Sequence, residues 1–400
     1  MRVLHVISSI DPRSGGTAAT VLNLSRAQVT AGLDVSLAAT WRKGDDVASA
    51  DVLRRAGVSV ELIGPCTTPL LWHRDIARLI DQQVASADVV HIHAIWEEIQ
   101  HQAAKSCRRA SVPYVMLPQG MLDPWSLAQR KLKKALYLRW RLRKDLNGAS
   151  AMHFTTEAER NLVAPLGLTP PVIVEPLGVD MAEFETLPPP GTFRDRFPQI
   201  AGRRIVLFLS RLHYKKGLDL LINAFANVAI PEAVLVLAGP VEAAYRSQLE
   251  AIIVSRGLSD RVIFTGMLHG SERVAALADA ELFVLPSHQE NFGIAVVEAV
   301  AAGTPVLISD QVNIWREIVE AGVGSAVPVD VAAISQELKR WLTDGALRNR
   351  AAERARAFAR ERYDWNIIAQ RWVGHYARLV NEPASAATPG LGAQARGRQP

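Results

Sequence analysis

The chain contains very little cysteine. Only Cys66 and Cys107 are present among its 400 residues, and they do not form a Cys-x-x-Cys pair. Two isolated thiols exclude the disulfide frameworks that small secreted domains use in place of a large core. We therefore expect a protein that is kept in the reducing cytoplasm, with both thiols inert.

Long apolar runs are also missing. No window approaches the roughly 18 apolar residues of a membrane-spanning helix, and the first ten residues are too short and too interrupted for a signal peptide. The formal net charge of +5 is modest. It favours anionic partners such as nucleotides or lipid-linked phosphates and does not require nucleic acid. With 49% hydrophobic and 21% charged residues, the chain has the composition of an enzyme with two sizeable cores.

Short apolar runs alternate with helical patterns, which is typical of parallel sheets with crossover helices. The sequence predicts strands at 2–8, 34–39, 59–63, 88–93 and 112–117, and a second series at 204–210, 233–238, 261–264, 281–285 and 305–308. We therefore predict an α/β protein of two Rossmann-like domains whose parallel sheets face each other across a cleft, with the site at the carboxyl ends of the strands. The predicted parts are an N-terminal Rossmann-like domain 1–184, a linker 185–195, a C-terminal Rossmann-like domain 196–363, a terminal helix 364–381 and a disordered tail 382–400.

Two glutamates with seven residues between them bracket a short loop that opens into a helix. Glu290 precedes the turn Asn291–Gly293, and the predicted helix runs from Ile294 past Glu298. Unpaired N–H groups at a helix start attract anions such as a diphosphate. Glu290 can accept hydrogen bonds from sugar hydroxyls, and Glu298 can accept them from a vicinal diol such as a ribose.

A basic loop follows the first strand of the second half. It contains Arg211, Lys215 and Lys216 and ends at Gly217. Arginine offers a planar fork of donors and lysine a mobile charge, so Arg211 and Lys216 can neutralise a leaving diphosphate. Lys215 is the weaker candidate.

The first half carries two further candidate sites. Gly15 and Gly16 follow the first strand, and their small size allows a ligand to approach the backbone closely. The loop is not a dinucleotide fingerprint, because the Gly-x-Gly-x-x-Gly spacing is missing. His91 and His93 lie on one face of a strand. Histidines satisfied by hydrogen bonds are favoured over a metal site, because no third ligand stands at a recognisable spacing.

These motifs together resemble the retaining glycosyltransferases of family four. The resemblance covers roughly residues 2 to 380 and rests on Arg211, Lys216, Glu290, Gly293 and Glu298 occurring in this order, with Gly303-Thr304-Pro305-Val306 after the helix. It implies a GT-B fold in which domain 1–184 lies on the acceptor side, domain 196–363 binds the nucleotide sugar and the helix 364–381 crosses back to the N-terminal domain. It also implies a retaining, metal-independent hexosyltransferase that needs no cofactor besides its nucleoside-diphosphate sugar.

The resemblance also implies residue roles. His93, Arg211, Lys216 and Glu290 would be catalytic, with His93 touching the transferred sugar and His91 structural. The donor would be bound by the residues of the two glycine-containing loops and the basic loop: Gly15, Gly16, Arg211, Lys216, Glu290, Asn291, Phe292, Gly293, Ile294 and Glu298. Asp123 and Trp125 would lie on the acceptor side, in a loop that resembles a bacterial subgroup building surface polysaccharide or lipopolysaccharide. Gln119 replaces the arginine of that subgroup's pattern.

The segment 130–144 is basic and helix-forming, with leucine, tyrosine and tryptophan between the cations. It either lies on an anionic membrane at the inner face of the plasma membrane or presents a solvated cationic face. Membrane docking would suit a lipid-linked glycan acceptor. Two other functions stay open: a sugar-nucleotide epimerase of the same fold, and a non-catalytic protein that binds nucleotide sugars.

Overall fold

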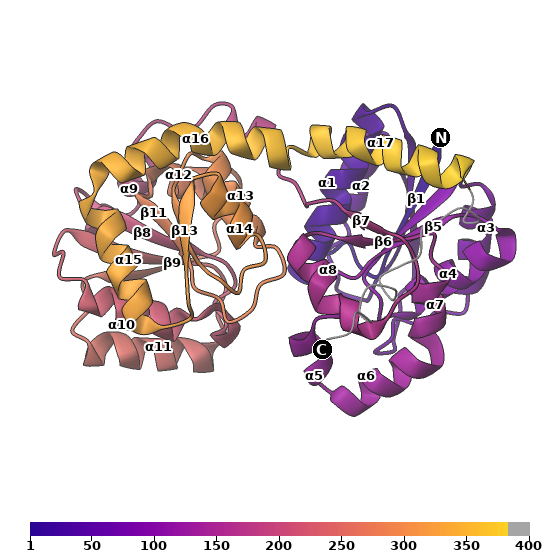
Figure 1. Ribbon diagram of the computed structural model, residues 1–400, viewed down its shortest axis with the longest axis horizontal. Coiled ribbons are helices and arrows are strands. Elements are labelled where there is room, and N and C mark those ends of the chain that lie inside the picture. The colour runs from indigo at the N-terminus through magenta and orange to yellow at the C-terminus, as the bar shows by residue number, and fades with distance from the viewer. Residues whose placement is uncertain (383–400) are drawn as a thin grey trace, which may run out of the picture. The chain divides into compact units, whose positions relative to one another are not determined.

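The computed structural model describes residues 1–382, which form two compact units. The first contains Met1–Gly178 and the described residues from Trp365 onward, and the second contains Val179–Asp364. Each unit is a parallel sheet with helices packed on it (Figure 1). The α/β class with two Rossmann-like units is thus confirmed.

The sheet of the first unit has seven strands in the order β3-β2-β1-β4-β5-β6-β7. Its strands are β1 Arg2–Ile7, β2 Asp34–Thr40, β3 Ser59–Ile63, β4 Val89–His93, β5 Tyr114–Leu117, β6 Ala151–Phe154 and β7 Val172–Val174. Its helices are α1 Gly16–Thr30, α2 Ser49–Arg55, α3 Ile76–Ala85, α4 Glu98–Ala110, α5 Pro124–Ala128, α6 Lys131–Tyr137, α7 Arg143–Asn147, α8 Glu157–Val163 and α17 Trp365–Asn381, with a π-helical segment at Leu138–Leu142. Helix α1 packs against α17, and α3 packs against α4.

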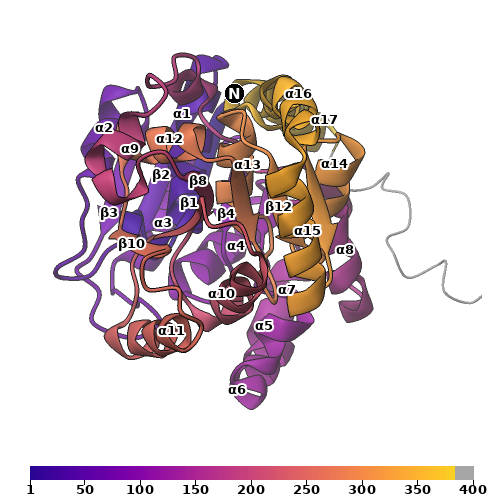
Figure 2. The same cartoon turned by 90° about the vertical axis from the view of Figure 1, so that its left-hand side faces the viewer.

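The sheet of the second unit has six strands in the order β10-β9-β8-β11-β12-β13. Its strands are β8 Arg204–Leu209, β9 Ala233–Ala238, β10 Val262–Gly266, β11 Leu282–Leu285, β12 Val306–Ser309 and β13 Gly324–Val327. Its helices are α9 Thr192–Arg196, α10 Leu218–Asn227, α11 Ala243–Ser255, α12 Gly270–Asp279, α13 Ile294–Ala301, α14 Trp315–Glu320, α15 Val331–Thr343 and α16 Gly345–Tyr363. Helix α10 packs against α15, and α13 packs against α16 (Figure 2).

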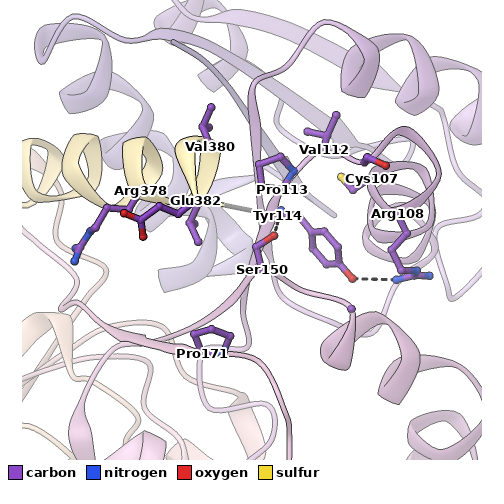
Figure 3. Close-up of a pocket in the computed structure, with 13 residues that line it drawn as sticks. Cys107, Arg108, Val112, Pro113, Tyr114, Ser150, Pro171, Arg378, Val380 and Glu382 are labelled. Carbon is purple, nitrogen blue, oxygen red and sulfur yellow. Dashed lines mark hydrogen bonds between the residues drawn. The ribbon is translucent and has the colours of Figure 1, made fainter. Parts of the chain in front are cut away.

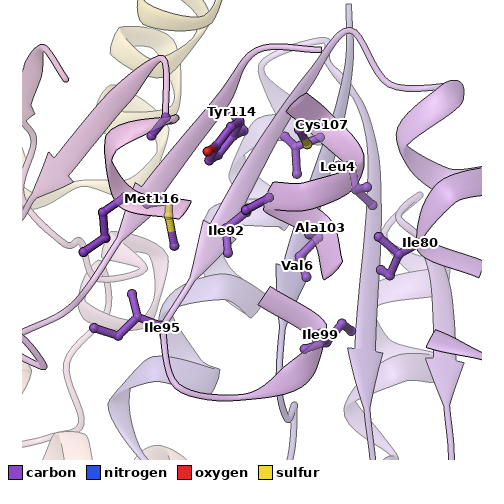
Figure 4. Close-up of a cluster of buried hydrophobic side chains, with 14 of the residues drawn as sticks. Leu4, Val6, Ile80, Ile92, Ile95, Ile99, Ala103, Cys107, Tyr114 and Met116 are labelled. Carbon is purple, nitrogen blue, oxygen red and sulfur yellow. The ribbon is translucent and has the colours of Figure 1, made fainter. Parts of the chain in front are cut away.

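The central strands are buried and largely apolar because helices cover both faces of each sheet, although β1 and β4 also carry His5, His91 and His93. Every residue of β9 is buried, and in the first unit Leu4, Val6 and Ile92 from neighbouring strands meet Ile80 and Ile99 from α3 and α4 (Figure 4). These runs of buried branched residues leave little choice between strand and loop at the sheet centres, so the strands there match their predicted positions within two residues.

The predicted linker 185–195 belongs to the second unit and is tied to it. The amides of Gly191 and Phe193 donate to the two carboxylate oxygens of Asp279 at 2.7 and 2.9 Å. The chain instead passes between the units at Gly178–Val179 and Asp364–Trp365. The prolines and glycine of this segment mark a turn that is held by the half-buried carboxylate of Asp279. Residues 383–400 of the predicted tail lie outside the described part of the chain.

Candidate functional site

Both sheets contain a point at which the strand order reverses. In the second unit the chain builds outward from β8 to β10 and then returns to place β11 on the other side of β8. In the first unit the same reversal occurs between β1 and β4. Loops at the carboxyl ends of such neighbouring strands diverge and leave room for a ligand. Most of the predicted donor-binding residues lie in the loops after β8 and β11 of one unit and after β1 of the other. His93 is the last residue of β4, Glu298 lies within α13, and the predicted acceptor-side residues follow β5.

The loops after β8 and β11 are joined closely. The amide of His288 donates to the carbonyl of Lys215 at 2.8 Å. Gly217, at φ 69°, lies so near the other loop that a Cβ there would stand 2.2 Å from the carbonyl oxygen of Pro286. Only glycine fits this position. The contact holds the basic loop against the loop that carries Glu290.

Lys216 and Glu290 meet in an ion pair between Nζ and Oε2. Their side chains are 18% and 19% exposed, so the pair is largely shielded from water yet reachable by a ligand. The backbone of Glu290 is fixed on both sides, since its amide donates to Gln311 and its carbonyl accepts from Asn313. A cation and a carboxylate are therefore held side by side at the reversal point. Arg211 is exposed, and it forms no ion pair with any residue from 1 to 382.

The start of α13 offers free hydrogen-bond donors. Gly293 adopts φ 83° and turns the chain into the helix, as predicted for this turn. The amides of Phe292, Gly293 and Ile294 have no acceptor among the described residues. The side chain of Phe292 is buried and packs edge-on against Tyr363. Phe292 would therefore contact a sugar donor only through its backbone amide, because its ring packs in the core.

Glu298 is paired with a residue that the sequence analysis missed. Arg273, from α12, forms ion pairs with both Glu298 and Glu183. Burial raises the pKa of Glu298, and the charge of Arg273 opposes that rise. A ribose diol would share this carboxylate with the guanidinium. No local pattern reveals Arg273, because it lies 25 residues from Glu298 along the chain.

In the first unit, Gly15 and Gly16 connect a 3₁₀ turn at Pro12–Ser14 to α1. Gly15 has φ 85°, which disfavours any other residue. A Cβ on Gly16 would meet nothing within 4 Å, so packing inside the unit does not demand glycine there. Open space in front of a helix start is compatible with a ligand. Asn291 and the other predicted donor residues lie in the second unit.

His93 ends β4 and is fully buried. Its Nε2 lies 2.9 Å from Nδ1 of His5, and its own Nδ1 has no partner among the described residues. His5, His91 and His93 each offer a nitrogen within 4.8 Å of the others, so the structure supplies the third ligand that the sequence did not reveal. Both ring nitrogens of His5 and of His91 are hydrogen-bonded, however, which leaves His93 alone with a free lone pair.

A pocket of about 310 Å³ lies beside these elements, and its lining includes a carboxylate that was not predicted. Glu97 is largely buried, its pKa is raised by that burial, and its Oε2 has no hydrogen-bond partner within residues 1–382. The rest of the polar lining comes from the ends of β1 and β2 and the start of α1: Ser8, Ser9, Ser14, Thr17, Arg42 and Asp45. The sequence contains one signal for Glu97, which is that it closely follows the predicted strand that carries His91 and His93.

The predicted acceptor-side residues differ in exposure. Asp123 is buried at the start of α5, and Trp125 is 37% exposed. Glu159 accepts from the amide of Gly120 at 2.6 Å and from both polar groups of Thr155 at 2.8 Å. This carboxylate holds the loop that carries Gln119 and Asp123 against β6.

Another pocket, of about 560 Å³, lies at the opposite end of β5 (Figure 3). Tyr114 donates to the carbonyl of Asp145 and accepts from Arg108 there. Burial raises the pKa of Cys107 to about 12, so this thiol stays protonated and inert. None of the predicted site residues lines this pocket. Within residues 1–382, every helix is too short or too polar to cross a bilayer.

Two protein-family models match the chain. One, described as "Glycosyl transferases group 1", covers residues 192–358, and the other, "Glycosyl transferase 4-like domain", covers residues 15–178. An uncharacterised glycosyltransferase of Methanocaldococcus jannaschii is 33% identical over 43% of the chain and 44% of its own length. The phosphatidyl-myo-inositol mannosyltransferase of Mycobacterium leprae is 34% identical over 52% of the chain and 56% of its own length. The chain thus spans about half the length of these two relatives.

A longer alignment reaches the GDP-mannose:cellobiosyl-diphosphopolyprenol alpha-mannosyltransferase of Xanthomonas campestris, at 26% identity over 96% of the chain and 98% of the relative. Among solved structures, Anabaena HepE in complex with UDP and glucose has a TM-score of 0.77 at 21% identity, covering 95% of this chain and all of HepE. WaaG, a glycosyltransferase involved in lipopolysaccharide biosynthesis, has a TM-score of 0.71 at 18% identity, covering 95% of this chain and all of WaaG. The chain shares the fold of these structures.

Proposed function

The chain belongs to the glycosyltransferase family that these two models describe, with the GT-B fold, and from that membership we propose that it is a retaining hexosyltransferase. The donor is a nucleoside-diphosphate sugar, and the acceptor is a glycan or a lipid-linked glycan in polysaccharide or lipopolysaccharide assembly. The observation that carries the proposal is the Lys216–Glu290 pair beside the free amides of Phe292, Gly293 and Ile294 at the β8–β11 reversal point.

The site suits a leaving diphosphate. Lys216 and the exposed Arg211 supply cations, and the amides at the start of α13 supply donors that need no reorganisation during the reaction. As the bond from the sugar C1 to the phosphate oxygen breaks, negative charge grows on the diphosphate. These groups stabilise that charge, so no metal ion or further cofactor is required.

Glu290 has two roles in this scheme. Its ion pair with Lys216 holds its carboxylate at the site before the donor binds, and sugar hydroxyls can replace part of that pairing. The acceptor hydroxyl forms the new bond to C1 from the face that the nucleotide leaves, and its proton passes to a phosphate oxygen of the departing nucleotide. No nucleophilic side chain is needed in this scheme. Glu298, with Arg273, is the proposed ribose contact.

The acceptor would bind in the first unit. The pocket lined by Ser8, Ser9, Asp45 and Glu97 presents hydroxyls and carboxylates that match the hydroxyls of a glycan. Asp123 and Trp125 remain predicted contacts for the acceptor's outer part.

A lipid-linked acceptor would require approach to a membrane. Leu132, Leu136 and Trp140 are 86%, 58% and 80% exposed and stand four residues apart along α6 and the π-helical segment, so they share one side. Cations including Lys131, Lys133 and Arg139 surround them. An apolar stripe among cations binds anionic bilayers in the plane of the head groups. We propose this segment as a peripheral membrane contact at the inner face of the plasma membrane.

The test is turnover of UDP-, GDP- and ADP-linked hexoses with a glycan acceptor, with and without EDTA. Acceptor-dependent release of nucleotide with an α-configured product from an α-configured donor, unaffected by EDTA, supports the proposal. Interconversion of free sugar nucleotides without release would instead identify an epimerase. Donor binding without any turnover would identify a non-catalytic binding protein.

A further inference from the structure

Four buried histidines line the central strands of the first unit. His5 on β1, His91 and His93 on β4 and His153 on β6 are all at most 1% exposed. Burial lowers the pKa of His5 and of His153 to about 4, and it lowers those of His91 and His93 well below the ordinary value. All four rings are therefore neutral near pH 7, and each carries one N–H and one lone pair.

The tautomer of one histidine is fixed by a backbone carbonyl. Nε2 of His153 lies 2.7 Å from the carbonyl oxygen of Glu175, which can only accept. His153 is therefore protonated on Nε2, and its Nδ1 is an acceptor. Nε2 of His91 lies 3.2 Å from that Nδ1 and must supply the proton. Nδ1 of His91 is then an acceptor in turn, and the hydroxyl of Tyr376 donates to it at 2.7 Å.

The series of hydrogen bonds continues from Tyr376 on α17 back to the sheet. The hydroxyl oxygen of Tyr376 accepts from Nε2 of Gln28 at 3.1 Å. This sets the orientation of the amide, so Oε1 of Gln28 accepts from Nε2 of His5 at 2.7 Å. Nδ1 of His5 then accepts from Nε2 of His93 at 2.9 Å. At the end of the series, Nδ1 of His93 is a lone-pair acceptor that no described residue satisfies.

The hydrogen bonds of this series cannot all be reversed. If the Gln28 amide were reversed, the Tyr376 hydroxyl would have to donate to Gln28, and Nδ1 of His91 would lose its donor. A buried acceptor without a donor costs about 1–3 kcal/mol. One carbonyl therefore determines the polarity of every bond in the series.

We propose that these side chains form a one-way hydrogen-bond relay that fixes the tautomer of His93 and leaves its Nδ1 to accept a hydrogen bond from a hydroxyl of a sugar ligand held by the first unit. The relay consists of His153, His91, Tyr376, Gln28, His5 and His93. Tyr376 and Gln28 are positioning residues, which act through the histidines. The site thus selects a ligand group that donates, and it disfavours a group that can only accept.

A metal is the competing occupant, and the ring geometry disfavours it. The His91 and His93 rings stack at 21°, with centroids 4.6 Å apart, and the His5 and His91 rings stack at 29°. Ring nitrogens ligate a metal within the ring plane, so stacked rings direct their lone pairs alongside one another rather than to one point. Metal binding would also break the bonds of His5 and His91.

The direct test is the protonation state of each ring in the intact protein. Long-range ¹H–¹⁵N correlation spectra of histidine-labelled protein at pH 7.5 distinguish protonated from bare ring nitrogens, and His→Gln variants assign the signals. All four buried histidines should be protonated on Nε2 alone. A protonated Nδ1 on His93, or a mixture of tautomers in the wild type, overturns the relay. So does a shift of these signals on adding Zn²⁺ alone.

Tyr376→Phe gives an asymmetric second test. The variant keeps the Glu175 carbonyl, so His153 and His91 should remain Nε2 tautomers. Gln28 loses its partner and can adopt either orientation, so His5 and His93 should become mixtures. Tyr114→Phe is the matched control, since that buried hydroxyl also donates and accepts within the first unit, and it should leave all four tautomers unchanged. A pure Nε2 tautomer of His93 in the Tyr376→Phe variant would contradict the proposal.

The selection of a donating hydroxyl rests on the proposed function. Among monodeoxyfluoro sugar ligands, the one that lacks the hydroxyl accepted by His93 should bind wild type at least tenfold more weakly, because fluorine does not donate. This penalty should shrink in Tyr376→Phe and persist in Tyr114→Phe. An equal penalty in both variants would overturn the selection. If the protein binds no nucleotide sugar, only this arm fails, and the tautomer measurements still decide whether the relay exists.

Discussion

At the residue scale, Lys216 makes the sharpest prediction for activity. Lys216→Ala removes the cation beside Glu290 and the charge that would stabilise the leaving diphosphate. We expect kcat to fall by about 10²–10³, in line with the loss of one preorganised donor. Steady-state nucleotide release measures it. Lys215→Ala, which removes an equal charge from the same loop, should keep most of the activity, and equal losses in the two variants would contradict the assignment.

Glu298 should affect binding rather than turnover. In Glu298→Gln the carboxylate that faces Arg273 is neutralised, so a ribose diol would lose a charged acceptor. Hydrogen bonds to charged groups contribute about 1.5–3 kcal/mol, so the nucleotide should bind at least about tenfold more weakly in calorimetric titration. Glu183→Gln is the control, because it removes the more exposed partner of the same arginine. Unchanged affinity in Glu298→Gln would exclude the ribose role.

Gly217 tests how tightly the two site loops must meet. Gly217→Ala places a methyl group within 2.2 Å of the Pro286 carbonyl and forces the loops apart. Gly257 has nearly the same φ, 66°, but no atom within 4 Å of its Cβ position, so Gly257→Ala carries only the backbone penalty of about 1 kcal/mol. Chemical denaturation should show a larger loss of stability for Gly217→Ala than for Gly257→Ala. Equal losses of stability in the two variants would show that the loops of Gly217 and Pro286 can move apart at little cost.

At the scale of elements, the histidine-bearing strands predict a stability that depends on pH. The pKa values of His5 and His153 are near 4 in the folded protein and near the ordinary 6.5 when unfolded. The free energy of unfolding is therefore unaffected by these two rings above pH 6.5, where they are neutral in both states. It decreases as pH falls toward 4, by up to about 3 kcal/mol for each ring, because only the unfolded state takes up the proton. The pKa of the Glu175 carboxyl is lowered despite its burial because of His375 and Arg371. Its stabilising contribution is therefore complete above its unfolded pKa and is lost only in more acidic solution than the range from pH 7 to 5.

The measurement is urea denaturation of the protein between pH 7 and 5, followed through the unfolding of the first unit. Stability should fall steadily in this range, where carboxylates are still ionised. His153→Gln, which can still donate to the Glu175 carbonyl, should flatten the slope. A stability that is constant from pH 7 to 5 would show that the buried rings are protonated without cost.

The sequence predicts strands well where a run of branched apolar residues marks them and poorly elsewhere. Such runs precede the loops of Lys216 and Glu290. Strands β6, β7 and β13 were not predicted. Strands β7 and β13 are short and only half-buried, and β6 is buried but its four residues include His153. The pairing of Glu298 with Arg273, and of His93 with His5, depends on which strands and helices become neighbours. No spacing along the chain encodes that order.

At the scale of the whole molecule, the charge and the exposed apolar side chains meet in one segment. Helix α6 extends away from the sheet of the first unit in both views (Figures 1 and 2). Of its cations, Lys134 is engaged with Ser126 and Trp96, and Arg141 in the following segment is paired with Glu98. Lys131, Lys133 and Arg139 stay exposed beside Leu132, Leu136 and Trp140.

The last prediction concerns this surface. Replacing Leu132, Leu136 and Trp140 by serine removes the apolar stripe and keeps every charge, so cosedimentation with vesicles rich in phosphatidylglycerol should fall at least tenfold. Binding of the wild type should also weaken as salt is raised, because each cation near an anionic surface contributes about 1 kcal/mol before screening. Val254→Ser, at an exposed apolar residue on α11, is the control and should bind as wild type does. Turnover of a water-soluble acceptor should be the same in all these proteins. Undiminished vesicle binding by the triple variant would mean that the stripe does not enter the bilayer, and the exposed cations would then be a solvated face.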